Sequence, residues 1–210
     1  MTIVLNSTTG ITTPPVSVQG ATSGSISIVA PDVAGTNTQT LVAATGTLAP
    51  LIAGTAVAST SGTSIDFTSI PSWVKRITVM FNGVSTSGTS PPQIQIGTSG
   101  GVQTTGYNGA NSVIGAAAVV TASFTAGFGI GVNTTNWAAA SAFGGAIVLT
   151  LLDSSTGIWA CSGAVSLGTA SSTFISSGYK SLSGTLDRVR ITTVNGTDTF
   201  DAGSINILYE

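Results

Sequence analysis

The chain contains no histidine, one cysteine and only 12 charged side chains in 210 residues. General acids and bases, nucleophiles and metal ligands are drawn chiefly from histidine, the acids, lysine, cysteine and tyrosine. Seven acids and five bases, spread over this length, leave little from which to assemble an active site. The sequence therefore predicts a protein that is not an enzyme, has no cofactor and needs no metal ion to fold.

The shortage of charge excludes further classes of protein. Charged residues make up 6% of the chain, against about 25% in ordinary soluble domains. With a net charge of −2, the chain lacks the basic face that nucleic-acid binding requires. Mean hydropathy is positive, at +0.49, but apolar stretches such as 116–120 and 147–152 are shorter than the roughly 20 residues of a spanning helix. We therefore expect neither a nucleic-acid partner nor membrane insertion.

The remaining composition favours a folded protein that works in an assembly. Cys161 has no second cysteine to pair with, and residues 1–7 lack the basic region of a secretory signal peptide, so neither a disulfide nor such a signal is expected. Low charge with 42% hydrophobic residues is the opposite of the usual disorder signature. With so little charge and with 62 serines and threonines, solubility must rely on hydroxyls, amides and backbone, which suits a chain whose surface is covered by copies of itself or by partners.

Residues 1 to about 50 contain no aromatic residue, and Asp32 is their only charge. Glycine and proline separate short alternating pieces, each about one strand long: Thr2–Leu5, Val16–Val18, Ser25–Val29 and Thr38–Val42. Such a segment has no large side chain with which to fill a core. We therefore expect an extended N-terminal β arm that orders among several copies of the chain, or against the sheet edge of another protein.

All 13 aromatic residues lie beyond residue 51, where strands are easy to predict. The expected strands are Ser64–Thr68, Trp73–Phe81, Gln93–Ile96, Gly145–Leu152, Ile158–Val165, Leu186–Val194 and Ser204–Tyr209. Asn82–Gly83 and Asn195–Gly196 predict hairpin turns. Only the alanine-rich stretches near Ala116 and Ala138 could be helical, and their glycine, valine and threonine neighbours disfavour long helices. The predicted fold class is all-β: an antiparallel, jelly-roll-like β-sandwich over 51–210, preceded by the arm 1–50.

Two acids close together near the C-terminal end, Asp198 and Asp201, are the first candidate site. Two carboxylates beside loop carbonyls could bind Ca²⁺, which takes oxygen ligands. Short acids also cap turns through nearby backbone groups. With no third acid close in the sequence, the turn-capping interpretation is favoured.

The bases form two pairs, Lys75–Arg76 and Arg188 with Arg190. They could bind an anionic glycan or a lipopolysaccharide phosphate. Ion pairs with Asp66, Asp187 or a neighbouring chain on a solvated sheet face are the favoured alternative.

Aromatic residues in the loop-rich stretch 98–145 are candidates for recognition of a ligand. Tyr107, Phe128 and Trp137, together with Phe124, could stack on sugar rings if their side chains are exposed. The alternative, that they fill the core of the sandwich, is favoured. We nevertheless take Tyr107, Phe128 and Trp137 as the first place to look for a surface recognition site.

Three segments resemble parts of tailed-bacteriophage virion proteins. TSIDFTSIPSWVKRITVMFNGVS at Thr63–Ser85 resembles a module of these structural proteins, many of them tail-fibre-like. Residues Ser183–Glu210, with the run LDRVRITTVNGTDTFDAGSINILYE, are similar to the C-terminal parts of the same proteins. Gly24–Leu41 resembles connecting pieces of phage fibres. The segments sample the start, middle and end of the chain.

The resemblance implies a non-enzymatic virion structural protein, assembled in the host cytoplasm and present in the virion as a homotrimer. The expected partners are copies of the chain and other virion proteins bound through the arm, and a host-surface glycan is a further candidate. Two roles remain open: a fibre or adhesin-like protein that displays its β-sandwich outward, and a capsid decoration or head-fibre protein. A depolymerase-type enzyme is disfavoured because such enzymes need placed acids.

Overall fold

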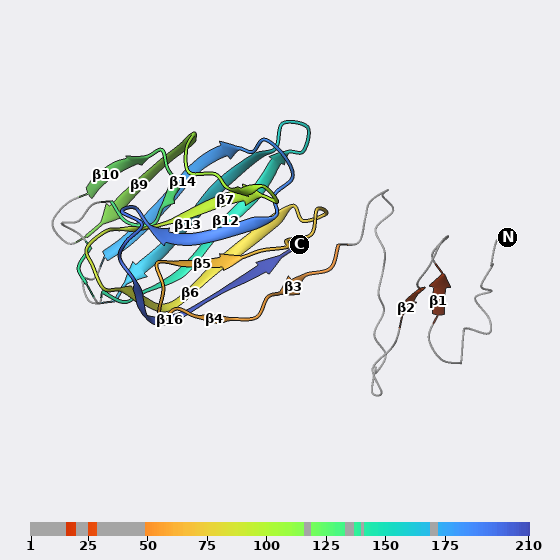
Figure 1. Ribbon diagram of the computed structural model, residues 1–210, viewed down its shortest axis with the longest axis horizontal. Helices are drawn as coiled ribbons and strands as arrows, with labels where there is room; N and C mark the ends of the chain where they lie inside the picture. Colours follow the sequence, from red (N-terminus) through yellow and green to blue (C-terminus); the bar gives the residue numbers. More distant parts are fainter. Residues whose placement is uncertain are drawn as a thin grey trace. The chain divides into compact units, whose positions relative to one another are not determined.

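The computed structural model describes residues 16–19, 25–28, 49–115, 119–132, 137–139, 141–168 and 172–210, and the chain divides into two compact units, Met1–Thr47 and Leu48–Glu210 (Figure 1). In the first unit, β1 (Val16–Gln19) and β2 (Ser25–Ile28) pair antiparallel. Two of the four predicted arm strands are thus present. The other two, Thr2–Leu5 and Thr38–Val42, lie outside the described residues.

The second unit consists of two antiparallel sheets. The larger contains nine strands in the order β10 (Val119–Phe124), β9 (Tyr107–Ile114), β14 (Ser172–Ser181), β13 (Ile158–Leu167), β12 (Phe143–Asp153), β6 (Arg76–Thr86), β16 (Phe200–Tyr209) and β3 (Ile52–Ala53), with β4 (Val57–Ala58) also on β16. The smaller runs β11 (Phe128–Gly129), β7 (Pro92–Thr98), β15 (Arg188–Thr193) and β5 (Ser64–Phe67), with β8 (Gly101–Val102) on β7. No helix occurs in the part of the chain that the structure describes. The predicted all-β fold class and two-sheet sandwich are confirmed.

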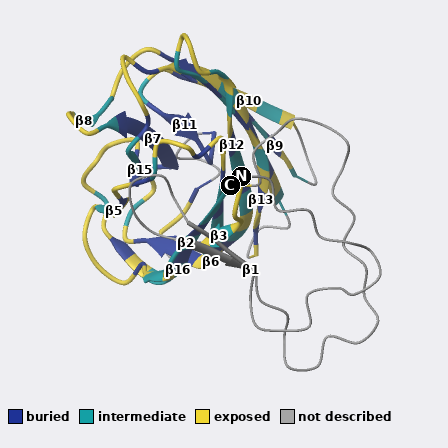
Figure 2. Cartoon of the chain, turned by 90° about the vertical axis from the view of Figure 1, so that its right-hand side faces the viewer, coloured by how far each residue is buried: buried dark blue, intermediate teal, exposed yellow. Residues whose placement is uncertain are grey.

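The core lies between the two sheets and follows the two-residue period of the strands. In β15, Val189 and Ile191 are fully buried, whereas Arg188 and Arg190 on the opposite face are only partly buried, as their alternation predicts. Ile77 and Val79 of β6 are likewise fully buried. Figure 2 shows the buried residues gathered on the strands, while exposed residues follow the connecting loops. Burying a Val or Ile side chain contributes about 1.5–3 kcal/mol, so these alternating rows hold the sheets together.

The predicted hairpin at residues 145–165 is confirmed. β12 and β13 pair antiparallel, with Leu149 opposite Cys161, and the intervening turn is closed by Asp153. Its carboxylate accepts hydrogen bonds from the backbone N–H and hydroxyl of Ser155 (2.8 and 2.7 Å) and from the hydroxyl of Thr156 (2.9 Å). The short polar run after an apolar strand therefore forms a self-capped turn.

The predicted hairpin turn at Asn82–Gly83 is wrong, because both residues lie inside β6. Gly83 has φ +61°, and the register against β16 shifts at this point, between Ala202 and Ser204. Asn–Gly supplies the left-handed conformation that a β-bulge needs as readily as the one a tight turn needs. Here the strand bends and continues to Thr86 instead of reversing.

The Asn195–Gly196 turn is present, but it does not form a hairpin. Gly196 has φ +69°, and its N–H donates to the carbonyl oxygen of Thr193 (3.0 Å). The turn carries the chain from β15 in the smaller sheet to β16 in the larger sheet. Within the described residues, no helix has the length and apolar character that crossing a bilayer requires.

Candidate functional site

The aromatic residues proposed for surface recognition lie in the core instead. Tyr107, Phe128 and Trp137 are 4%, 0% and 1% exposed, and Phe124 is also buried. Trp137 packs edge-on against Phe143, with ring centroids 5.0 Å apart. Rings covered in this way are not available to stack on a sugar, so these residues are corrected to core positions. They fill the core together with other buried rings, among them Phe143, Phe174 and Phe200.

Tyr107 also ties the two sheets together. Its hydroxyl accepts from the backbone N–H of Ile96 (2.7 Å) and donates to the carbonyl oxygen of Gln103 (2.9 Å). Its ring meets that of Phe128 in a T-shaped contact at 5.0 Å. Burial raises the pKa of Tyr107 well above its ordinary value, so the phenol acts as a neutral hydrogen-bonding group.

All six carboxylates in the described residues are bound within the protein. Asp198 accepts from the backbone N–H of Ser90 (2.9 Å) and from the amide of Asn195 (2.7 Å), and Asp201 accepts from the hydroxyl of Ser85. Asp198 therefore joins its own turn to a distant loop, rather than capping the turn alone. Among the described residues, no three His, Cys, Asp or Glu side chains lie close enough together to hold a metal ion.

Ion pairs account for three of the five bases: Arg188 and Arg190 pair with the predicted acids, whereas Arg76 pairs with an acid that was not predicted and Lys75 with none in the described residues. Arg190 makes two hydrogen bonds to the carboxylate of Asp66 (2.7 and 2.8 Å) across β15 and β5. Arg188 pairs with Asp187 at 2.9 Å, and Arg76 pairs with Glu210 at 2.6 Å. Lys180 is buried, donates to the carbonyl oxygen of Ser181 (2.8 Å) and lies 5.5 Å from the ring centroid of Tyr107.

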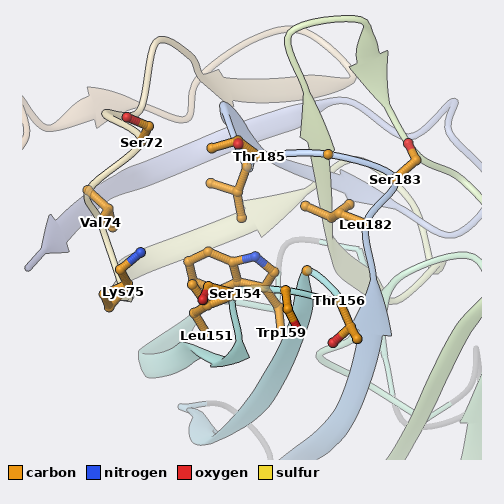
Figure 3. Close-up of a pocket in the computed structure, with 14 residues that line it drawn as sticks. Ser72, Val74, Lys75, Leu151, Ser154, Thr156, Trp159, Leu182, Ser183 and Thr185 are labelled. Atoms are coloured by element: carbon orange, nitrogen blue, oxygen red, sulfur yellow. The ribbon is translucent and has the colours of Figure 1, made fainter.

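All five bases lie in the described part of the chain, and Lys75 differs from the other four in its surroundings. Its side chain is exposed and has no hydrogen-bond or ion-pair partner there. It borders a pocket of about 270 Å³ (Figure 3). This Lys75 pocket is walled by the segment before β6, the β12–β13 turn and the β14–β15 connection; its lining residues are Ser72, Val74, Lys75, Leu151, Ser154, Ser155, Thr156, Gly157, Trp159, Leu182, Ser183, Gly184, Thr185 and Leu186.

Backbone hydrogen bonds hold the three walls in place. The N–H of Leu151 donates to the carbonyl oxygen of Lys75 (2.8 Å), and the N–H of Leu182 donates to that of Gly157 (3.0 Å). The hydroxyl of Ser181 donates to the carbonyl oxygen of Thr156 (2.9 Å). A pocket whose walls are fixed in advance loses little conformational freedom when a ligand enters.

The polar side chains of the Lys75 pocket are the ammonium of Lys75 and the hydroxyls of serines and threonines, and no carboxylate lines it. Three of the hydroxyls, those of Ser72, Ser154 and Thr185, make no hydrogen bond within the described structure. In Figure 3 the amino group of Lys75 points toward the indole of Trp159, and Thr185 and Leu182 face the same space. Trp159 is 3% exposed, so almost none of its ring can be reached from the pocket.

Asp153, on the β12–β13 turn, is the closest acid in the sequence to the serines and threonine of that wall. The hydroxyl of Ser155, its backbone N–H and the hydroxyl of Thr156 lower the pKa of Asp153. The carboxylate therefore stays ionised, but three donors already occupy it. It closes the turn and leaves the ammonium of Lys75 without a counter-ion.

Two other hollows, of about 440 and 320 Å³, share Gln93 in their linings. The first has no charged lining residue, and in the second the only one, Arg190, is paired with Asp66. The Lys75 pocket is the hollow, among these three, that offers an unpaired charge, and we take it as the candidate site.

Comparison of the chain with protein-family models, with curated proteins and with solved structures found no match. The geometry of the candidate site is therefore the basis for any functional argument. Sequence reasoning named Lys75 together with Arg76, Arg188 and Arg190 as bases that could bind an anion, but it did not distinguish Lys75 from them and it missed the pocket. Its serines and threonines come from three segments far apart in the chain, in a sequence where such residues occur everywhere.

Proposed function

We propose that this chain is a non-enzymatic structural protein of a tailed-bacteriophage virion, of the fibre or adhesin-like kind. Residues 1 to about 50 attach it to other virion proteins, and the β-sandwich is displayed outward. Copies of the chain associate as a homotrimer. The sequence resemblance described above suggests this setting, and features of the sandwich agree with it.

The observation that carries the proposal is the outer face of the nine-stranded sheet, which has hardly any charge. Two successive rows of paired residues face away from the core and contain no charged side chain: Thr121, Ser112, Ile175, Ala164, Ala146, Met80 and Asn206 in one, and Ser123, Ala110, Ser177, Ser162, Val148, Thr78, Leu208 and Ala53 in the other. Ordinary soluble surfaces carry interspersed charges that keep molecules apart. A broad neutral face suits a protein that functions within an assembly.

The arrangement of the acids also supports a non-enzymatic role. Each described carboxylate is engaged in an ion pair or hydrogen bond, and none of them lines the Lys75 pocket. Hydrolysis of a glycan by the usual route requires two facing carboxylates. The pocket is instead equipped to bind.

Deletion of residues 1–50 tests the proposal in a phage that encodes the chain. We expect the truncated protein to keep its β-sandwich, seen as an unchanged unfolding transition, but to be missing from purified virions. Normal incorporation of the truncated protein contradicts the attachment role. Locating the full chain in a virion density map then separates the fibre role, with a handful of copies, from capsid decoration, with many tens to hundreds.

A further inference from the structure

We propose that the Lys75 pocket binds one sugar unit that carries a carboxylate group. The ammonium of Lys75 contacts the carboxylate, and the hydroxyls of Ser72, Ser154 and Thr185 contact the sugar hydroxyls. The inference deepens the proposed function and rests on it for its biological meaning. Binding itself is measured on the purified chain.

The charge of the ligand follows from Lys75. Three of the other bases face a carboxylate and Lys180 is buried, whereas Lys75 is exposed at the pocket and has no partner in the described structure. No acid lines the pocket, so a ligand with an ammonium group, such as a free amino acid, would find no counter-ion. The site therefore selects a single negative charge.

The rest of the ligand follows from the hydroxyls. A hydroxyl both donates and accepts hydrogen bonds, so the unpaired hydroxyls of Ser72, Ser154 and Thr185 fit a ligand that does both. Sugar hydroxyls have this property, whereas a bare phosphate or sulfate chiefly accepts. Of the apolar side chains that line the pocket, Val74 and Leu182 are as buried as Trp159, and Leu151 alone is partly exposed, so contacts with the C–H groups of a sugar ring are a minor part of recognition.

The size of the pocket limits the ligand to a small unit. Its volume of about 270 Å³ lies just below the range of about 300–1,000 Å³ that is usual for larger ligands. Because Trp159 is almost wholly covered, a ring cannot stack across it. Recognition must come from charge and hydroxyl contacts, so the interaction is weak for a single sugar and gains strength from several copies of the site.

The experiment is an NMR titration of the purified full-length chain with D-glucuronate, and with D-glucose and acetate as probes that each lack one half of the ligand. The protein has three tryptophans, so the indole N–H signals are few, and Trp159→Phe assigns the relevant one. We expect glucuronate to shift the Trp159 signal and leave that of Trp137 unchanged. Glucose and acetate should each bind about tenfold more weakly.

Two matched variants test the role of Lys75. Lys75→Gln removes the unpaired charge, and Arg76→Gln removes the charge of the adjacent residue, which pairs with Glu210 and does not line the pocket. We expect Lys75→Gln to weaken glucuronate binding about tenfold, and Arg76→Gln to change it less than about twofold. Both residues are exposed, so an unchanged unfolding transition confirms that each variant is folded.

The inference is overturned if glucuronate does not bind, if glucose or acetate binds equally well, or if the two variants weaken binding equally. These outcomes are distinguishable from failure of the proposed function. A chain that is found in virions but binds no sugar acid contradicts the pocket assignment alone. A chain that binds glucuronate through Lys75 but is absent from virions contradicts the virion role alone.

Discussion

The single cysteine, Cys161, is buried, and burial changes the pKa of its thiol. It is 4% exposed, and its Sγ lies 4.0 Å from the hydroxyl of Ser176. Burial raises the pKa of the thiol to about 12 from its ordinary value of 9.0. Thiolates, not thiols, are the reactive species, so this cysteine acts as a small apolar core residue.

The raised pKa predicts how stability depends on pH at the alkaline end. Below about pH 9 the thiol is protonated in both the folded and unfolded states, and the free energy of unfolding is unaffected by it. Above this pH the unfolded chain loses the proton while the folded chain keeps it, so Cys161 lowers the free energy of unfolding by about 1.4 kcal/mol per pH unit, up to about pH 12. Tyr107 acts in the same direction at higher pH.

Urea unfolding between pH 8 and about pH 10.5, on the wild type and on Cys161→Ala, measures the effect. The variant is expected to be less stable at neutral pH, because a buried side chain is shortened, but to lose stability less steeply with pH. Identical slopes for the two proteins would show that the thiol ionises equally in both states.

Among the strands, the bulge where β6 meets β16 is the clearest case of one residue fixing the shape of an element. Gly203 has φ +88°, and a Cβ built on it would collide with the backbone carbonyl oxygen of Gly83. Gly83 has φ +61°, and no heavy atom lies within 4 Å of a Cβ built on it. The two glycines share a bulge but differ in the space around them.

Replacing each glycine by alanine separates strain from collision. Gly83→Ala should lower the free energy of unfolding by about 1 kcal/mol, the usual cost of a left-handed conformation in a residue with a Cβ. Gly203→Ala should cost more, about 1–3 kcal/mol or above, because the backbone must also move. Chemical unfolding measures both values. Equal losses would mean that the backbone around Gly203 moves aside at no additional cost in free energy.

Alternation of apolar residues predicted strands on both sides of the core. Val189 and Ile191, and the hairpin at residues 145–165, are such cases. However, β9 and β10 lie in the stretch 98–145, which was predicted to be loop-rich, and were missed. β14 was missed because its inward positions include Ser176 and Gly178, so Phe174 alone marks the period. The Asn82–Gly83 bulge was mistaken for a turn because the Asn–Gly pair favours a left-handed backbone conformation that occurs in both turns and bulges. Whether the chain reverses there depends on pairing with β16, which lies far away in the sequence.

The candidate site was less predictable than the fold. Pairing of Arg190 with Asp66 could be anticipated from their scarcity, since a chain with so few charges tends to pair them. The Lys75 pocket depends on how three distant segments meet. Nothing in the local sequence distinguishes Ser72, Ser154 and Thr185 from the rest of the 62 serines and threonines, so only the folded structure identifies them.

At the scale of the whole molecule, the neutral outer face of the nine-stranded sheet bears on assembly. Three of the larger apolar side chains that remain exposed, Ile114, Ile175 and Tyr179, belong to the neighbouring strands β9 and β14 on this sheet. Strand pairing places Ile175 between Ala164 and Ser112, in one of the two uncharged rows of the outer face. A second copy of the chain can cover such a face without desolvating any charge.

The proposed homotrimer is tested by light scattering of the full chain at micromolar concentration. We expect trimers for the wild type and dissociation for Ile175→Lys, which places a charge in the uncharged row. Leu152→Lys is the control, because Leu152 is 70% exposed and lies at the end of β12, outside the two uncharged rows. A wild-type chain that is monomeric throughout counts against the trimer, and equal dissociation of both variants counts against this face.

The position of β16 has a consequence for how the protein is made. This strand comes last in sequence among the described strands, yet it lies inside the larger sheet, between β6 and the pair β3 and β4. Until it has been synthesised, β6 has an open edge and the inner residues Ile205 and Ile207 are missing from the core. The complete sandwich can therefore form only after β16 has been synthesised, with closure of contacts far apart in the chain setting the pace. A polypeptide that ends before β16 leaves β6 unpaired, so interrupted synthesis does not yield a complete sandwich.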